Sequence, residues 1–367
     1  MSANFNAEVG TNRRTVLNFE DNRLLTALFG EHDANLARIE QKLGVIIIPR
    51  GNKISIEGPE SACEQVTLVL KNLYKRVEEG LAIVQGDVDG AMRMANAAGA
   101  IDINQVSNKT EQDLDPDALD NSLAQSVKIT TRKRVIAPRS PAQALYMNSL
   151  INEEMVFGVD PAGTGKTYLA VATAVAKMMT GEIDRIILSR PAVEAGESLG
   201  FLPGDLKEKV DPYLRPLYDA LYDTMAPEQV DKKLETGEIE SAPLAFMRGR
   251  TLSNAFVILD EAQNTTPMQM KMFLTRFGEN CRMVIAGDPS QTDLPRGMES
   301  GLVQAMRYLG GVRGIHTVRF GEADIVRHPL VGRIVRAYGQ AEENSNRPSK
   351  SSKSKPKNKQ DKTDHDE

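Results

Sequence analysis

The sequence predicts an α/β protein whose main domain is a parallel sheet with helices on both faces, preceded by a small α+β domain and followed by a disordered tail. Two observations favour this fold. Apolar, β-rich runs alternate with helical stretches between residues 128 and 340, which is typical of a parallel sheet. The first run leads through a glycine-rich loop directly into a helix. The runs are EMVFGV, RIILSR, AFVILDE, CRMVIAGD and GIHTVRF.

The composition limits the class of protein. Of the 367 residues, 41% are hydrophobic and 26% are charged, as in ordinary soluble proteins. Without an apolar leader or a run of about 18 apolar residues, we expect a cytoplasmic protein that does not contact membranes. The net charge of −5 argues against coating nucleic acid by bulk electrostatics, but it leaves a local basic groove open. Cys63 and Cys281 have no companions at metal-ligand spacing, so we expect two core thiols.

Residues 15–85 predict the small domain. VLNFE is a strand, RLLTALFG and ANLARIEQKLG are helices, VIIIPRGNKISIEG is a hairpin, and SACEQVTLVLKNLYKRVEEG is a longer helix. The order βααββα resembles a KH domain, which binds single-stranded RNA. The GXXG loop of KH domains corresponds to Gly30–Asp33, which lacks the second glycine and contains two acids. RNA binding through this loop and a scaffold or protein-contact role both stay open.

Two polar segments flank the main domain, which we place at 128–340. Residues 86–127 predict an acidic linker with one short helix in DGAMRMANAAG. Residues 341–367 have almost no apolar side chains and predict a disordered tail. The tail lysines suit RNA or ribosome-like polyanions, but the final DKTDHDE cancels much of their charge. A purely solubilising tail is the equal alternative.

A phosphate-binding loop is predicted at GVDPAGTGKT, residues 158–167, between a strand and the helix YLAVATAVAKMM. The pattern G-x-x-x-x-G-K-[ST] fits at its far end, where backbone N–H groups would cradle phosphate oxygens. Lys166 would act in catalysis by reaching the β and γ phosphates of ATP, and Thr167 would hold Mg²⁺. The predicted nucleotide-binding residues of the loop are Asp160, Pro161, Ala162, Gly163, Thr164, Gly165, Lys166 and Thr167.

Asp160 stands where the pattern has its first glycine. A residue before proline is pushed toward extended backbone angles, so we expect no need for glycine and its positive φ at this position. At about 5 Å and an effective dielectric near 20, the carboxylate would repel each phosphate charge by about 3 kcal/mol before screening. We expect a loop that folds but binds ATP more weakly than a glycine version. A side chain that points away or binds a cation is the alternative.

Three further segments place polar side chains near the loop. FVILDEAQN ends a strand with Asp260, predicted to hold Mg²⁺ with Thr167, and Glu261, predicted to polarise the attacking water. VIAGDPSQTDLP supplies Gln291, a catalytic candidate that would sense the γ-phosphate. APRSPAQALYMNSL supplies Gln143, whose amide offers the donor and acceptor that an adenine edge accepts. A surface helix glutamine is the alternative for Gln143.

Together these segments resemble the PhoH family, in particular bacterial PhoH-like proteins with a KH-like N-terminal domain, over about residues 15–340. The resemblance implies a P-loop NTPase core of the RecA-like, superfamily-one helicase-like type, with ATP hydrolysis. It also implies RNA metabolism or ribosome maturation, a link to phosphate starvation, and an endoribonuclease or ribosome-assembly partner. The segments that carry it are TRKRVIAPRSPAQALY, DPAGTGKTYLA, SRPAVEAGESLGFLPGD, DEAQNTTPMQMKMFLTRFG, AGDPSQTDLP and DIVRHPLVGRIVRAYG.

The same resemblance gives roles to several arginines. Arg190 would contact the nucleic-acid backbone, with a salt bridge inside the domain as the equal alternative. Arg327 or Arg333 would stabilise charge on the transferred phosphoryl group. Superfamily-one helicases place ATP between two cores, whereas this sequence predicts one, so we expect a head-to-tail homo-oligomer that completes the site. We expect His316 and His328 to be structural.

Three functions are compatible with these patterns. The leading hypothesis is an RNA-linked ATPase, a helicase or remodelling factor that acts on RNA or a ribosomal particle. The second is an adaptor that binds ATP weakly or not at all and recruits a partner through the KH-like domain and the tail. The third, a small-molecule kinase, shares the phosphate loop but is disfavoured by the DEAQ and GDPSQ segments.

Overall fold

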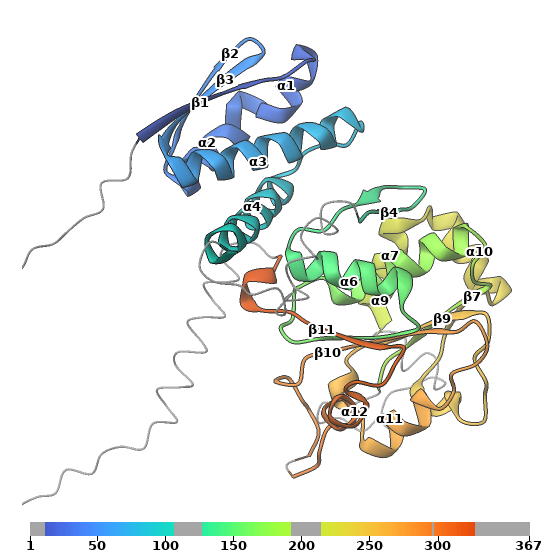
Figure 1. The fold of residues 1–367 in the computed structure, drawn as a ribbon. Coiled ribbons are helices and arrows are strands. Elements are labelled where there is room, and N and C mark those ends of the chain that lie inside the picture. The colour runs from blue at the N-terminus through green and yellow to red at the C-terminus, as the bar shows by residue number, and fades with distance from the viewer. Residues whose placement is uncertain (1–11, 106–126, 192–213, 296, 327–367) are drawn as a thin grey trace, which may run out of the picture. The chain divides into compact units, whose positions relative to one another are not determined.

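Residues 12–105, 127–191, 214–295 and 297–326 are described by the computed structural model (Figure 1). They contain a three-stranded sheet, a six-stranded sheet and a two-stranded hairpin of β4 (Ile129–Thr130) and β5 (Val135–Ile136). The predicted tail at 341–367 and the centre of the predicted linker lie outside these residues.

The small domain begins with the predicted element order βααββα. Its bounds are β1 Asn12–Asn18, α1 Asn22–Phe29, α2 Ala34–Leu43, β2 Ile46–Arg50, β3 Lys53–Pro59 and α3 Glu60–Glu78. The sheet has the order β1-β3-β2 with antiparallel neighbours. Ile54 and Ile56 alternate into the core from β3, and Leu28 and Ile39 reach the same core from the helices.

The predicted GXXG loop, Gly30–Asp33, contains a short 3-10 helix over Glu31–Asp33. His32 and Asp33 both have positive φ, at 53° and 57°. The side chains of Glu31, His32 and Asp33 are exposed. Two carboxylates therefore face solvent at the position where a KH domain clamps the nucleic-acid backbone.

Helix α4 (Gln85–Gln105) corrects the expectation of a linker with one short helix from residue 86 onward. Val88, Met92 and Ala95 are buried in the core of the small domain, so the first part of this segment belongs to that domain. Gly86 and Gly90 weaken the helical pattern, because each glycine costs about 1 kcal/mol relative to alanine in a helix.

The larger sheet confirms the predicted α/β fold, with six parallel strands in the order β11-β6-β10-β9-β7-β8. Five strands are the predicted apolar runs, and β8 is a short addition at the edge. The bounds are β6 Met155–Val159, β7 Arg185–Ser189, β8 Ile239–Ser241, β9 Ala255–Leu259, β10 Arg282–Gly287 and β11 Ile315–Arg319. Ile187 and Val257 face one core, while Ile186 and Phe256 face the other.

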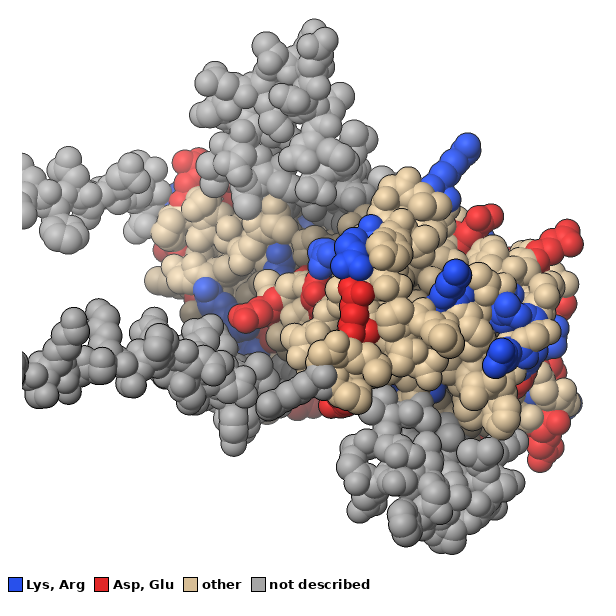
Figure 2. Space-filling model, turned by 90° about the horizontal axis from the view of Figure 1, so that it is seen from below, with Lys and Arg blue, Asp and Glu red and all other residues tan. Residues whose placement is uncertain are grey.

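Helices cover both faces of this sheet (Figure 1). One face carries α6 (Pro141–Asn152), α7 (Lys166–Met179), α9 (Arg215–Thr224) and α10 (Pro227–Thr236). The other carries α11 (Pro267–Leu274) and α12 (Gly301–Leu309). Seen from the α11 and α12 side, Lys and Arg side chains are interspersed with Asp, Glu and uncharged residues (Figure 2). Within the described ranges, no helix is long and apolar enough to cross a membrane.

Both cysteines are buried free thiols, as the sequence predicts. Cys63 belongs to the core of the small domain, and Cys281 belongs to the core under α11 and α12. Burial raises the pKa of Cys281 to about 11, so its thiol stays protonated and unreactive at neutral pH.

The backbone of Gly158 in β6 packs closely against the fully buried ring of Tyr146. This ring in turn makes a T-shaped contact with Phe320. A Cβ atom at position 158 would lie 2.7 Å from Cε2 of Tyr146. We therefore predict that Gly158→Ala lowers the free energy of unfolding by about 1–3 kcal/mol in urea denaturation. Gly321→Ala is the control, because its Cβ would meet nothing closer than 3.7 Å. Equal stability of the two variants would show that the ring can shift freely.

Candidate functional site

The loop that the sequence predicts to bind phosphate lies between β6 and α7. Gly163 and Gly165 have φ of 85° and 87°, which glycine adopts without strain. Gly165 is the N-terminal cap of α7, so the first turn of the helix points its free N–H groups at the loop. The backbone N–H of Val326 donates to the carbonyl of Gly163 at 2.9 Å and ties the end of the described chain to the loop. The geometry is that of an anion-binding helix N-terminus.

Lys166 lies over the loop and is only 8% exposed. Its ammonium donates to the carbonyls of Asp160 and Pro161, the latter at 2.8 Å, and to Oγ1 of Thr164 at 3.3 Å. Burial lowers the pKa of Lys166, while four carboxylates oppose this effect. In decreasing order of influence, these belong to Asp288, Asp260, Glu261 and Asp160. Phosphate oxygens would replace weak carbonyl acceptors at this ammonium.

The backbone of Asp160 contradicts the expectation drawn from Pro161. Asp160 has a φ of 79°, in the left-handed region where glycine is favoured. The proline ring disfavours the right-handed helical region for the preceding residue, but it does not forbid positive φ. Two contacts hold the unusual backbone of Asp160. Its N–H donates to the carbonyl of Gly287 at 3.2 Å, and its carbonyl accepts from the Lys166 ammonium. This positive φ at position 160 gives a conformational reason for the glycine that the pattern has there.

The Asp160 carboxylate pairs with a cationic side chain, that of Arg319, and binding to a cation was one alternative left open by the sequence. Its Oδ2 lies 3.4 Å from Nη1 of Arg319 on β11. The arginine side chain is 65% exposed, so the pair contributes little to stability. Asp160 also has the weakest influence of the four carboxylates on the pKa of Lys166.

Thr167 and Asp260 lie together. The threonine hydroxyl at the start of α7 donates to Oδ1 of Asp260, just beyond β9, at 2.7 Å. Burial raises the pKa of the Asp260 carboxyl, although the Thr167 hydrogen bond lowers it. The backbone N–H of Asp260 donates to the carbonyl of Ser189 at 2.9 Å, and the buried hydroxyl of Ser189 has no hydrogen-bond partner within the described ranges. Hard oxygen donors of this kind fit Mg²⁺, which keeps waters and phosphate oxygens among its ligands. The described residues contain no cluster of three His, Cys, Asp or Glu that could hold a metal.

Glu261 is oriented by two neighbours. Its backbone has a φ of 51°, and its Oε1 lies 3.3 Å from Nη2 of Arg190. The salt bridge that the sequence left open for Arg190 is therefore present. Gln263 donates from Nε2 to Oε2 of Glu261 at 2.6 Å. A carboxylate fixed on both oxygens has a defined direction, as a group that orients a water requires.

Gln263 is a site residue for which sequence reasoning gave no role. It is 1% exposed and donates from Nε2 to the carbonyl of Gln291 at 3.2 Å, while its Oε1 accepts from Asp288 N–H at 3.0 Å. Position 287 requires a glycine, because a Cβ atom added there would lie 2.7 Å from this Oε1. The signal was available as the last letter of DEAQ, a polar residue four positions after the end of a buried strand. Gln263 joins the segments that follow β9 and β10.

The Gln291 side chain is exposed and pairs with its own segment. Its Nε2 donates to Oδ2 of Asp288 at 2.7 Å. Asp288 is 7% exposed and also accepts from the backbone and hydroxyl of Ser290. Among the carboxylates, Asp288 has the largest influence on the pKa of Lys166, so Gln291 binds a carboxylate that acts on this lysine.

Gln143 is buried, at 5% exposed, so the surface-glutamine alternative is wrong. Its Nε2 donates to the carbonyl of Thr164 at 2.8 Å, and its Oε1 accepts from the N–H of Arg139 at 2.7 Å. The amide thus holds the phosphate loop to α6. One donor and one lone pair of the amide are unused by these two bonds.

Several predicted residues lie outside the described part of the chain. These are Arg327, Arg333 and His328, together with most of SRPAVEAGESLGFLPGD after Pro191. His316 lies within it, and its Nδ1 is 2.8 Å from Oγ of Ser149 on α6, in keeping with a structural role.

Comparison with known proteins gives consistent matches. The family described as PhoH-like protein matches residues 135–339. The PhoH-like protein of Bacillus subtilis (strain 168) is 46% identical over 312 residues, covering 85% of this chain and 93% of the relative. The PhoH-like protein of Synechocystis sp. is 44% identical over 320 residues, covering 87% and 92%. Protein PhoH of Escherichia coli (strain K12) is 46% identical over 205 residues, covering 55% and 58%.

Asp160 allows a test of backbone strain in the loop. Asp160→Ala removes the carboxylate but keeps a side chain at positive φ, whereas Asp160→Gly removes both. We predict that the glycine variant has the higher free energy of unfolding by about 1 kcal/mol, because a left-handed backbone penalises Cβ. Chemical denaturation of both variants measures the difference. An alanine variant as stable as the glycine variant would contradict the strain.

Asp260 allows a test of the cost of burying the carboxylate. Because its folded pKa is raised, the ionised form destabilises the fold above the ordinary carboxyl pKa. We predict that Asp260→Asn raises the free energy of unfolding by about 1 kcal/mol at pH 7, and by less near pH 4. Denaturation at both pH values measures this difference, with exposed Asp184→Asn as the control. A less stable Asp260→Asn at pH 7 would contradict the prediction.

Proposed function

This chain belongs to the PhoH family, whose members are nucleotide-binding, ATPase-like proteins, and from this we propose that it binds and hydrolyses ATP with Mg²⁺. One observation carries the proposal: the Thr167 hydroxyl and the Asp260 carboxylate meet at 2.7 Å beside the Lys166 ammonium and a helix N-terminus. A phosphate chain needs an anion-binding loop, a cation and a metal ligand pair at one place. These groups supply all three.

The roles of the residues follow from their positions. The N–H groups of the loop and of the first turn of α7 would bind phosphate oxygens, and Lys166 would turn from the loop carbonyls to the β and γ phosphates. Thr167 and Asp260 would hold Mg²⁺, which would supply positive charge to offset that of the transferred group. Glu261, directed by Arg190 and Gln263, would orient the attacking water. We further propose that Arg327 of a neighbouring copy supplies the stabilising cation, which requires a head-to-tail homo-oligomer.

We also propose that hydrolysis is coupled to RNA or a ribosomal particle. Support comes from the small domain, whose element order and β1-β3-β2 sheet resemble a single-stranded RNA binder. The exposed acids of Glu31–Asp33 argue for contact through another surface of that domain. Gln263 offers a physical route for coupling, since it bonds both Glu261 and the segment containing Gln291. An endoribonuclease or ribosome-assembly partner and a role in phosphate starvation stay predictions of the family resemblance.

An adaptor that binds ATP weakly is the second candidate function. The observation that favours it is Asp160, a carboxylate at the phosphate loop whose exposed partner Arg319 screens it only weakly. The two candidates agree on the fold and differ in turnover. They are therefore separated by kinetics rather than by structure.

The test is ATP hydrolysis with and without single-stranded RNA. We predict that Lys166→Ala and Glu261→Gln each lower turnover by about 100-fold or more, while wild type is stimulated by RNA. Lys271→Ala, an exposed lysine on α11, is the control. Asp160→Ala should tighten binding of an ATP analogue, because it removes phosphate repulsion.

Wild-type turnover at background with every RNA, together with measurable ATP binding, would support the adaptor. Light scattering with the analogue present tests the oligomer, and a monomer would contradict the arginine supplied by a neighbouring copy.

A further inference from the structure

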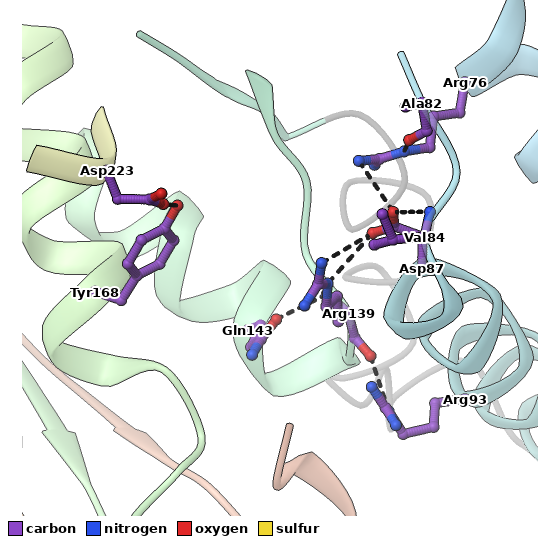
Figure 3. Close-up of polar contacts among 9 residues, drawn as sticks. All are labelled: Arg76, Ala82, Val84, Asp87, Arg93, Arg139, Gln143, Tyr168 and Asp223. Atoms are coloured by element: carbon purple, nitrogen blue, oxygen red, sulfur yellow. Dashed lines mark hydrogen bonds and ion pairs between the residues drawn. The ribbon is translucent and has the colours of Figure 1, made fainter. Parts of the chain in front are cut away.

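A cavity of about 550 Å³ continues from the phosphate loop toward the small domain. Its size is in the range of small-molecule sites. Figure 3 shows its two walls, with Tyr168 and Asp223 on one side and Ala82, Val84 and Asp87 on the other. Gly163, Gly165 and Gln143 of the loop region line the same cavity. A ligand with its phosphates on the loop would extend into this space.

The wall from the small domain is a built contact. Gly86 and Gly90 lie one turn apart on α4 against Arg139, which precedes α6. A Cβ at position 90 would lie 3.1 Å from Cα of Arg139, and a Cβ at position 86 would lie 3.2 Å from its Nη1. These glycines weaken α4 as a helix, and their small size permits the approach of Arg139.

Polar contacts fix Arg139 from the same helix (Figure 3). Its guanidinium donates to Oδ1 of Asp87 from Nη2 at 3.2 Å and from Nε at 3.3 Å. Asp87 is 8% exposed and also accepts from the N–H of Val84 at 3.0 Å. Arg93, further along α4, donates from Nε to the carbonyl of Arg139 at 3.0 Å. Arg139 is thus held by both its side chain and its backbone.

The contact continues to the phosphate loop. The N–H of Arg139 donates to Oε1 of Gln143, and Nε2 of Gln143 donates to the carbonyl of Thr164. Three residues therefore connect α4 with the loop: the Asp87 side chain, the side chain and backbone N–H of Arg139, and the Gln143 amide. The unused donor and lone pair of Gln143 suit the edge of a base.

The opposite wall combines an aromatic ring with paired charges. The Tyr168 hydroxyl donates to Oδ2 of Asp223 at 2.8 Å, and Arg134 pairs with Oδ1 of Asp223 at 2.7 Å. Tyr168 directly follows the loop residue Thr167 and is partly buried. A planar heterocycle suits such a wall, because it can stack on the aromatic ring. The Asp223 and Arg134 charges keep each other as partners and need none from the ligand.

We propose that this cavity binds the nucleoside of the nucleotide, so that residues 81–87 of the small domain form one wall of the ATP site. The Asp87, Arg139 and Gln143 contacts then couple the docking of α4 to nucleotide affinity. This inference rests on the proposed function, because the phosphates must first bind the loop. By linkage, a bound nucleotide strengthens the docking of α4 in return.

The test separates the nucleoside from the phosphates. Calorimetric titration of the full chain uses a non-hydrolysable ATP analogue and, in parallel, tripolyphosphate, which lacks the nucleoside. Ala82→Trp adds a large ring at an exposed position of the cavity wall. We expect at least a tenfold loss of affinity for the analogue and less than a twofold change for tripolyphosphate.

A second pair of variants tests the coupling. Asp87→Asn should weaken analogue binding about threefold to tenfold. Asp89→Asn is the matched control on α4, because Asp89 pairs with Arg38 and Lys42 inside the small domain and does not line the cavity. Hydrogen exchange should show slower exchange of α4 amides when the analogue is bound, and this readout needs no substitution.

The outcomes distinguish failure of the nucleoside site from failure of ATP binding itself. Wild type that binds neither ligand contradicts the proposed function and the inference with it. Wild type that binds both, with Ala82→Trp unchanged or weakened equally for both, leaves ATP binding in place and overturns the nucleoside site. Equal effects of Asp87→Asn and Asp89→Asn, with no change in exchange of α4, overturn the coupling.

Discussion

The parallel pairing of β6 with β10, and of β10 with β9, is the constraint on which the site depends. Parallel neighbours end at the same edge of a sheet, so the loop after β6 meets the segments after β9 and β10 there. Carboxylates that lie far apart in the sequence, chiefly those of Asp288 and Asp260, consequently act on the pKa of Lys166. The chemistry of the site is therefore a property of strand order, and the loops only supply the side chains.

The same convergence creates an electrostatic cost. Carboxylates outnumber the lysine near the loop, and burial raises the pKa of the Asp260 carboxyl. A buried charge of this kind disfavours the fold unless a cation or hydrogen bonds compensate it. The Thr167 hydroxyl compensates part of this cost by donating to Oδ1 of Asp260. Gln263 fixes the neighbouring segments without adding charge, because it binds Glu261 and accepts from the backbone N–H of Asp288. In the proposed function, the carboxylates beside the loop would favour phosphate that arrives with a divalent cation over free phosphate, because the cation reverses the local field.

The parts that sequence reasoning predicted are those that depend on short-range pattern. Five strands, the phosphate loop and the Asp260 position follow from apolar runs and their polar ends. The backbone of Asp160 could not be predicted from Pro161, because the contacts with Gly287 and Lys166 decide it. The length of helix α4 was underestimated, because Gly86 and Gly90 lower the local helical signal. Their small size serves the tertiary contact with Arg139 instead. Burial of Gln143 likewise depends on the loop that packs over α6.

The contact between α4 and Arg139 sets a limit on what the small domain can do to nucleotide affinity. Asp87 is nearly buried, but the Arg139 side chain is 36% exposed, so solvent screens part of their attraction. A few hydrogen bonds of this type give a coupling of about 1–3 kcal/mol, or roughly 5-fold to 150-fold in affinity. A complete switch between two states needs about 5.5 kcal/mol. If the nucleoside binds as we propose, the small domain would tune nucleotide affinity, and an all-or-none control would need further contacts.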